Sequence, residues 1–136
     1  MATLATLKYL GDLQTECTHV SSGAKLITDA PVSFLGKGES FSGTDLFALS
    51  LGTCAMTVMG IYAKKNNLDI SGATAEVSRT MADNPRRIQA LEVIFHMPGR
   101  AFSEKEKKDL MEVAQACPVS MSLGGVEQSI IFDWPE

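Results

Sequence analysis

Hydrophobic and polar positions alternate loosely through the first third of the chain, which predicts β-strands. The stretch Thr6–Val20 is rich in Thr, Leu and Val, and a second strand-like stretch covers Ala24–Pro31 after the turn residues 21–23. Short alternating runs bounded by Ser, Gly and Pro are typical of strands. The two stretches together predict an N-terminal hairpin.

A long run without charged residues follows, from Leu46 to Ala63. Ser42, Thr44 and Asp45 precede it and are all good N-cap residues, so we expect a helix from Thr44 to Asn66. The run reaches the lower end of the roughly 17 to 25 residues that span a bilayer. Small and hydroxyl residues dilute its hydrophobicity, however, and charged residues bracket it closely, so we expect a buried helix and no membrane span.

The second half of the chain predicts another hairpin, an amphipathic helix and a closing strand. The turn residues Asn84-Pro85 separate the strand-like runs Ile70–Met81 and Arg87–Pro98. A Ser-x-x-Glu capping box at residues 103–106 opens a helix. The last strand-like run is Val126–Trp134, whose Ile130, Phe132 and Trp134 fall on one face.

The amphipathic helix ends at a cysteine that is followed by proline. Leu110, Val113, Ala114 and Cys117 lie on one helical face, and Pro118 is favoured in the first turn of a new helix. Residues 117–123 therefore predict a short helix with Cys117 near its N-terminus, where the helix dipole would lower the pKa of the thiol.

This order of elements predicts an α+β fold with helices packed on antiparallel sheet, in a single domain that covers residues 1–136.

The formal net charge of −4 and the pI near 5.2 argue against a nucleic-acid surface. The N-terminus lacks the features of a secretory signal, so we expect a cytoplasmic protein. Three cysteines in a reducing compartment argue against a structural disulfide framework.

Two of these cysteines stand in distinctive settings. Cys54 lies within the uncharged helix, and Cys117 lies at the junction between a helix and proline. Each cysteine alone is explained more simply as an inert core residue, whereas the pair suggests two-cysteine redox chemistry.

Three phrases of the sequence are distinctive when taken together: SGTDLFALSLGTCAMTVM, ACPVSMSL some 60 residues later, and the opening GDLQTECTHVSSGAKLITDAP. In these phrases and their order the chain resembles the OsmC/Ohr superfamily of thiol-dependent hydroperoxide reductases. This resemblance implies an intertwined homodimer with the long helices buried at its centre. It also implies that Cys54 attacks an organic hydroperoxide, that Cys117 resolves the resulting sulfenic acid, and that an external dithiol of the lipoyl type re-reduces the disulfide. No cofactor or metal is implied.

The sequence departs from the family pattern beside these cysteines. Gln14 stands where typical members carry the arginine that activates the thiolate, and Asp45, nine residues before Cys54, is the best candidate for the acid that positions this arginine. Another positively charged side chain must then stabilise the thiolate, and the candidates are Arg86, Arg87, Lys8 and Lys25. We therefore expect peroxidase activity below or different from that of a typical member. The alternative is a diverged, non-enzymatic protein that binds a small hydrophobic ligand or senses redox state slowly.

Three other residues are weaker candidates for a functional site. Cys17 and His19 lie on the same face of a predicted strand and could ligate a metal, but their spacing matches no zinc pattern, so we interpret both as structural. His96 lies at the end of a predicted strand, and we interpret it as structural. The alternative that it acts as a base for a cysteine stays open.

Overall fold

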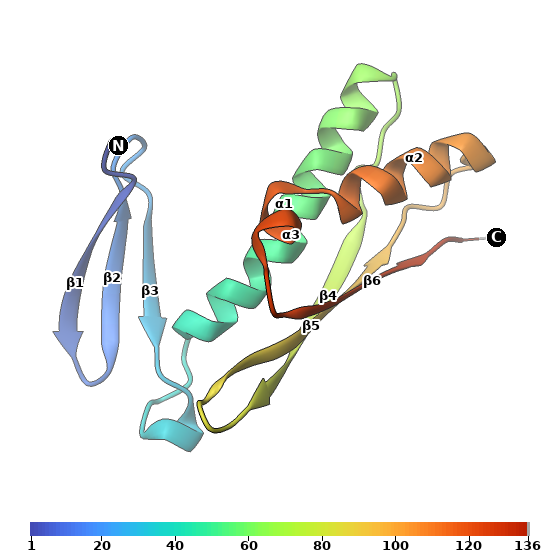
Figure 1. The fold of residues 1–136 in the computed structure, drawn as a ribbon. Coiled ribbons are helices and arrows are strands. Elements are labelled where there is room, and N and C mark those ends of the chain that lie inside the picture. Colours follow the sequence, from blue (N-terminus) through green and yellow to red (C-terminus); the bar gives the residue numbers. More distant parts are fainter. Residues whose placement is uncertain (136) are drawn as a thin grey trace. The chain divides into compact units, whose positions relative to one another are not determined.

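A computed structural model describes residues 1–135 of the chain. Figure 1 shows its elements in chain order. They are β1 (Ala5–Gly11), β2 (Gln14–His19), β3 (Lys25–Asp29), the 3₁₀ helix η1 (Val32–Phe34), α1 (Gly43–Lys65), β4 (Thr74–Ala82), β5 (Arg87–His96), α2 (Glu104–Gln115), α3 (Pro118–Ser122) and β6 (Glu127–Asp133). The mixture of helices and strands confirms the α+β prediction.

The chain divides into two compact units, Met1–Phe47 and Ala48–Glu136. A single domain over residues 1–136 stays a prediction. The first unit is a three-stranded antiparallel sheet in the order β1-β2-β3. It contains one strand more than the predicted hairpin, because the stretch interpreted as one strand turns at Asp12 and Leu13, which have φ values of 52° and 63°. Two successive positive φ values are typical of a tight hairpin turn, and the Gly-Asp pair at 11–12 was the overlooked signal.

Helix α1 begins with a reciprocal cap. The Ser42 hydroxyl accepts the Asp45 N–H at 3.1 Å, and the Asp45 carboxylate accepts the Ser42 N–H at 2.9 Å. Each side chain satisfies a backbone donor that the first helical turn leaves without a partner. The helix covers residues 43–65, one residue from the prediction at each end.

The second unit places its helices against a three-stranded sheet in the order β4-β5-β6. Strands β4 and β5 pair antiparallel as predicted, but β6 pairs parallel to β5, so the expectation of purely antiparallel sheet is wrong here. The reason is the long connection through α2 and α3, since two parallel neighbours require a crossover of a dozen or more residues.

The core of this unit joins α1, β5 and α2. Leu51, Ala55 and Met59 on α1 are fully buried, as are three side chains on the inner face of β5 (Leu91, Val93 and Phe95) and Leu110 and Ala114 on α2. Helix α1 lies so close to the sheet that a Cβ atom at Gly52 would be only 3.0 Å from Cγ2 of Val77. By length and composition α1 could also cross a membrane, but these contacts make it the core helix of the second unit.

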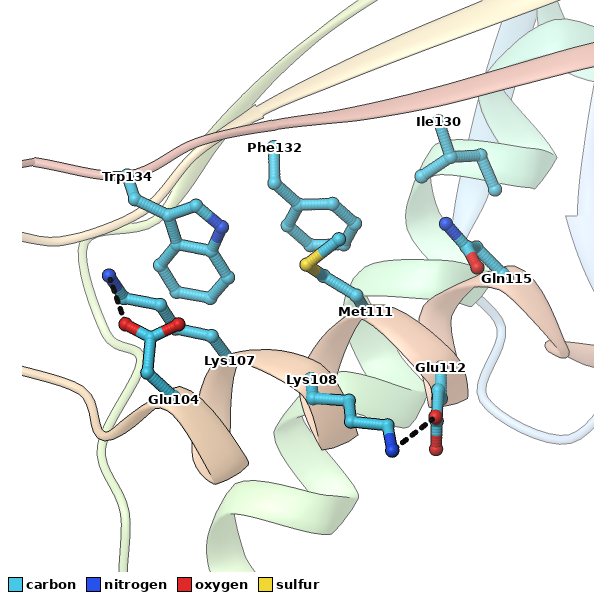
Figure 2. Close-up of a pocket in the computed structure, with 9 residues that line it drawn as sticks. All are labelled: Glu104, Lys107, Lys108, Met111, Glu112, Gln115, Ile130, Phe132 and Trp134. Atoms are coloured by element: carbon cyan, nitrogen blue, oxygen red, sulfur yellow. Dashed lines mark ion pairs between the residues drawn. The ribbon is translucent and has the colours of Figure 1, made fainter.

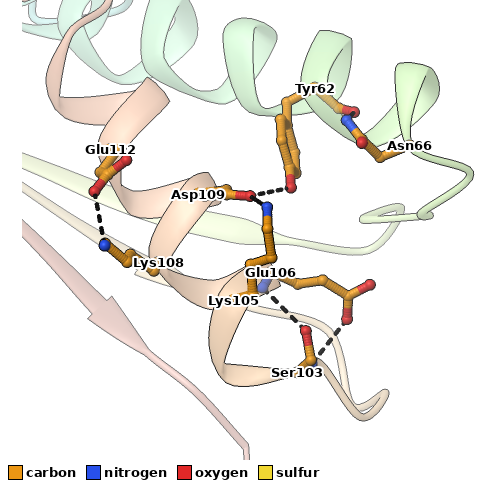
Figure 3. A network of polar contacts seen from close by, with 8 residues as sticks. All are labelled: Tyr62, Asn66, Ser103, Lys105, Glu106, Lys108, Asp109 and Glu112. Carbon is orange, nitrogen blue, oxygen red and sulfur yellow. Dashed lines mark hydrogen bonds and ion pairs between the residues drawn. The ribbon is translucent and has the colours of Figure 1, made fainter.

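A polar network ties α2 to α1 (Figure 3). The capping box predicted at Ser103 and Glu106 is present, with hydrogen bonds of 2.8 Å and 3.0 Å. One turn on, the Asp109 carboxylate accepts the Tyr62 hydroxyl at 2.7 Å and pairs with Lys105 at 2.6 Å. These bonds lower the pKa of Asp109, chiefly through Lys105, and raise the pKa of Tyr62, so the network holds a carboxylate and a neutral phenol at neutral pH.

His96 joins all three strands of the second sheet at one end. Its Nε2 lies 2.6 Å from the Glu76 carboxylate on β4, and its Nδ1 lies 2.8 Å from the Asp133 carboxylate next to it on β6. The hydrogen bonds to Glu76 and then Asp133 raise the pKa of His96 above its ordinary 6.5. Only the protonated ring donates to both carboxylates.

The stability of this unit should therefore depend on pH through His96. A raised pKa means that the stabilisation is complete below about pH 6.5 and is lost as the pH rises through the folded-state pKa. We expect His96→Asn to lower the melting temperature clearly at pH 6 and little at pH 9, as measured by circular dichroism. An equal loss at both pH values would contradict the proposed charge on His96.

Candidate thiol site

Cys54 lies on α1 in the second unit and is half-buried. It follows Gly52, where the helix packs closely against Val77 of the sheet, and it packs against the same core as the apolar side chains of Met56 and Val58. The thiol is therefore partly open to solvent but surrounded by apolar neighbours.

Cys117 is the N-cap of α3, as its position before Pro118 predicted. Its sulfur accepts the Ser120 N–H at 3.4 Å, and its side chain is buried, with 1% of its surface exposed. The sulfur thus occupies the place that a Ser or Asp oxygen fills in an ordinary cap.

The structure brings these two thiols close enough for one to affect the ionisation of the other, because Cys54 is among the groups that raise the pKa of Cys117. Both are free cysteines. Burial raises the pKa of Cys117 above its ordinary 9.0, and negative charge on Cys54 raises it further, while the N–H groups of Ser120 and Val119 oppose the change. The expected lowering by the helix dipole is wrong in net effect, because α3 is a helix of 5 residues and its N–H groups do not offset the burial of the thiol.

The raised pKa gives the two thiols different properties. Cys117 keeps its proton at neutral pH and can donate it to the sulfur of Cys54, which is also the more accessible of the two. Attack on a substrate requires an accessible sulfur, which Cys54 has. Resolution requires a second sulfur nearby, and Cys117 must lose its proton in that step.

A network that sequence reasoning missed holds α3, and with it Cys117, in place. The Ser120 hydroxyl donates to the Gln128 side chain at 2.6 Å and lies 3.0 Å from the Gln115 carbonyl. The Gln128 amide returns a bond to the Ser120 carbonyl at 2.9 Å. These bonds tie α3 to β6 and to the end of α2. They join residues that are 5 and 8 positions apart but belong to three different elements, and no local motif signals them.

Gln14 and Asp45 belong to the first unit, and each has a local partner there. Gln14 lies opposite Asp29 across β2 and β3, and the buried Asp29 carboxylate accepts the N–H groups of Lys37 and Glu39. The Glu39 bond is the main cause that lowers the pKa of Asp29. Asp45 caps α1, as described above. Both contacts are structural, and catalytic roles for Gln14 and Asp45 stay predictions.

The cations proposed to replace the missing arginine are exposed at the surface of their own units. Arg86 pairs with Asp83 at 3.5 Å, and Lys25 pairs with Glu16 at 3.0 Å. Arg87 donates to two carbonyl groups of the turn before β5, and Lys8 is exposed on β1. By contrast Arg79 alternates with exposed residues along β4 and is half-buried.

The Cys17-x-His19 pair has local partners as well. The Cys17 sulfur lies 3.8 Å from the Thr15 hydroxyl, and the His19 ring lies 2.6 Å from the Ser22 hydroxyl. Within residues 1–135, no group of three or more His, Cys, Asp or Glu side chains is arranged to hold a metal ion.

A separate groove lies between α2 and β6 (Figure 2). It has a volume of about 520 Å³. Its wall on β6 is formed by Ile130, Phe132 and the neighbouring Trp134, with the Phe132 and Trp134 rings stacked at 5.7 Å between centroids. Met111 faces this wall from α2, and Lys107 places its ammonium 5.5 Å from the Trp134 ring. The groove is apolar on one side and charged along the helix.

Comparison with solved structures shows the same fold across the whole chain. A candidate osmotic stress induced and detoxification response protein from Psychrobacter arcticus is 39% identical, with a TM-score of 0.93 and coverage of 98% of this chain and 97% of that one. An organic hydroperoxide resistance protein OsmC from Legionella pneumophila is 18% identical, with a TM-score of 0.73 and coverage of 98% and 97%.

A further structure, an organic hydroperoxide resistance protein from Elizabethkingia anophelis, is 18% identical, with a TM-score of 0.70 and coverage of 98% and 96%. A search of proteins with curated functions found no match. Residues 36–130, which include both Cys54 and Cys117, match the family described as OsmC-like protein. Together with the 39% identical relative, this match shows that the chain belongs to the OsmC-like family.

Proposed function

We propose that the protein is a thiol-dependent peroxidase that reduces organic hydroperoxides to alcohols. The observation that carries the proposal is that the accessible Cys54 lies close enough to the buried Cys117 to raise the pKa of its thiol. Membership of a family that includes hydroperoxide resistance proteins supports it.

The reaction begins at the sulfur of Cys54. Its thiolate attacks the outer oxygen of the hydroperoxide, the O–O bond breaks, and the alkoxide leaves with a proton as alcohol. Cys54 is oxidised to a sulfenic acid. The Cys117 sulfur then attacks the Cys54 sulfur, water leaves, and a disulfide forms. An external dithiol restores both thiols by exchange and becomes a disulfide itself.

The surroundings of the thiols favour an organic substrate. Cys54 packs against the same apolar core as Met56, Val58 and Val119, and an apolar alkyl group would lose unfavourable contact with water there. Hydrogen peroxide has no apolar group and gains nothing from these contacts. A lipoyl-type dithiol is the proposed reductant.

We also propose a cytoplasmic homodimer in which Gln14 and Asp45 reach the thiol site. Only 33% of the most apolar part of α1 is buried within one chain, and Ile61 on this helix is 49% exposed. Leu7, Tyr9 and Ile27 on the first sheet are exposed too. Exposed apolar area on this scale marks a protein interface, and sedimentation of a dimer-sized species would support it.

Turnover tests the proposal. Purified protein should consume cumene hydroperoxide with dihydrolipoamide or dithiothreitol, and should consume hydrogen peroxide more slowly. The measurement follows the remaining peroxide over time. An absence of consumption above the rate of dithiol alone would overturn the proposal.

The second candidate function is binding of a small apolar ligand in the groove between α2 and β6. The stacked Phe132 and Trp134 rings favour it, because a flat apolar molecule can lie against them. Quenching of the fluorescence of Trp134, the one tryptophan in the chain, would report such binding without any peroxide.

A further inference from the structure

The side-chain amide of Gln128 contacts a single residue of α3 at two points. Its Oε1 accepts the Ser120 hydroxyl at 2.6 Å, and its Nε2 donates to the Ser120 carbonyl at 2.9 Å. The same hydroxyl lies 3.0 Å from the carbonyl of Gln115 at the end of α2. Ser120 is therefore fixed from β6 and from α2 at once.

Gln128 stands on β6 at a position where the strand pattern calls for an apolar residue. It is half-buried, and it lies on the same face as Ile130 and Phe132, because alternate residues of a strand share a face. Those two side chains pack against the core. A buried amide without partners costs free energy, and the two bonds to Ser120 satisfy this amide and fix its orientation.

Ser120 in turn contacts the sulfur of Cys117. Its backbone nitrogen lies 3.4 Å from this sulfur and donates a hydrogen bond to it. Helix α3 has only 5 residues, and so short a helix is not stable alone, because ordering its backbone gains very few hydrogen bonds. The position of the Ser120 N–H therefore depends on the bonds that hold Ser120 from outside the helix.

The bond from Ser120 matters most when Cys117 is a thiolate. Burial raises the pKa of this thiol, and the Ser120 N–H opposes the change. A hydrogen bond to a charged acceptor is roughly twice as strong as one to a neutral acceptor, so this N–H favours the thiolate.

The thiolate of Cys117 is the form that the resolving step needs. Cys117 gives up its proton, its sulfur attacks the sulfur of the Cys54 sulfenic acid, and hydroxide leaves and takes up a proton as water. The earlier attack on the hydroperoxide takes place at Cys54 and does not involve the bond from Ser120.

We propose that Gln128 is a positioning residue for the resolving thiol, which holds the Ser120 N–H on the Cys117 sulfur and so sets the rate of disulfide formation. Gln128 acts through Ser120 and is not assigned a contact with the substrate. The proposal rests on the proposed function for its place in a catalytic cycle, but its test needs no peroxide.

The test follows the resolving step with dithionitrobenzoate, an aromatic disulfide, in a Cys17→Ser background, because Cys17 is half-buried like Cys54 and would react too. One equivalent forms a mixed disulfide on Cys54 and releases a first thionitrobenzoate anion. The Cys117 thiolate then attacks the Cys54 sulfur, the mixed disulfide breaks, and a second anion leaves with the bonding electron pair. Cys54 carries no charge in the mixed disulfide, so its effect on the pKa of Cys117 disappears. The absorbance of the anion gives both rates.

Gln128→Met keeps the length of the side chain and removes both bonds to Ser120. We expect an unchanged first release and a second release slowed about three- to tenfold at pH 7, because a hydrogen bond to the thiolate is weakened. The loss should shrink as the pH rises through the pKa of Cys117, since the thiolate then forms without this bond. The control Gln89→Met makes the same change at an exposed position of β5 and should leave both rates unchanged.

Ser120→Ala is the second variant. It removes the hydroxyl but keeps the carbonyl that accepts from Gln128, so it should slow the second release less than Gln128→Met does. The double variant should be little slower than Gln128→Met alone, because the two substitutions act through one contact. If circular dichroism shows that Gln128→Met does not fold, Ser120→Ala carries the test.

Three results would overturn the proposal. They are a second release at the wild-type rate in Gln128→Met, the same rate in Ser120→Ala where only that variant folds, and a loss that is equal at every pH, as a merely loosened α3 would give. If the second release depends on Gln128 as expected while the wild type reduces no peroxide, this proposal stands and the proposed function fails. If the wild type reduces peroxide and Gln128→Met resolves normally, the reverse holds.

Discussion

Cys54→Ser will abolish the reduction of organic hydroperoxides, with a fall in kcat/KM of roughly a thousandfold or more. A serine hydroxyl stays protonated at neutral pH and does not attack the O–O bond. The change is nearly isosteric at a half-buried position, so the fold should persist. The measurement is peroxide consumption with a dithiol at matched concentrations of folded protein.

Cys117→Ser is the matched variant, because it alters the neighbouring cysteine, whose pKa Cys54 raises. It should still reduce one equivalent of peroxide, since attack requires only Cys54, and it should accumulate a sulfenic acid that a dimedone probe detects. Continued turnover should be slower because the internal disulfide cannot form. If Cys54→Ser kept wild-type activity, the assignment of Cys54 as the attacking residue would be wrong.

Phe95→Ala will destabilise the protein by about 3 to 5 kcal/mol. Phe95 is fully buried at the centre of the second unit, and its ring stacks on Phe132 with 5.3 Å between the centroids. Truncation removes both the buried apolar surface and the aromatic contact and leaves a cavity that rigid strands cannot fill. Urea unfolding followed by circular dichroism would measure the change.

Ile131→Ala provides the control for this effect. Ile131 is next to Phe132 in β6 but points to the opposite face and is 43% exposed. We expect Ile131→Ala to lower the free energy of unfolding by about 1 kcal/mol or less. Equal losses at the two positions would show that the core does not lie on the face assigned here.

Much of the fold was predictable because local signals agreed with one another. The uncharged run with its capping residues gave α1 to within one residue at each end. The capping box at Ser103 and the proline after Cys117 gave the starts of α2 and α3. The parallel pairing of β6 was missed, because strand direction depends on where a crossover returns and not on the pattern within the strand.

The candidate site was predictable only in part. The order of the two cysteine phrases identified Cys54 and Cys117, but nothing in the spacing could show that burial would raise the pKa of Cys117.

The central claim is that Cys54 and Cys117 form one redox couple. Its most direct test is mass spectrometry of the protein after one equivalent of cumene hydroperoxide, with free thiols blocked by iodoacetamide and peptides mapped without reduction. We predict a disulfide between the Cys54 and Cys117 peptides, whereas Cys17 should be recovered as an alkylated free thiol. Recovery of Cys54 as an alkylated, unoxidised thiol would contradict it.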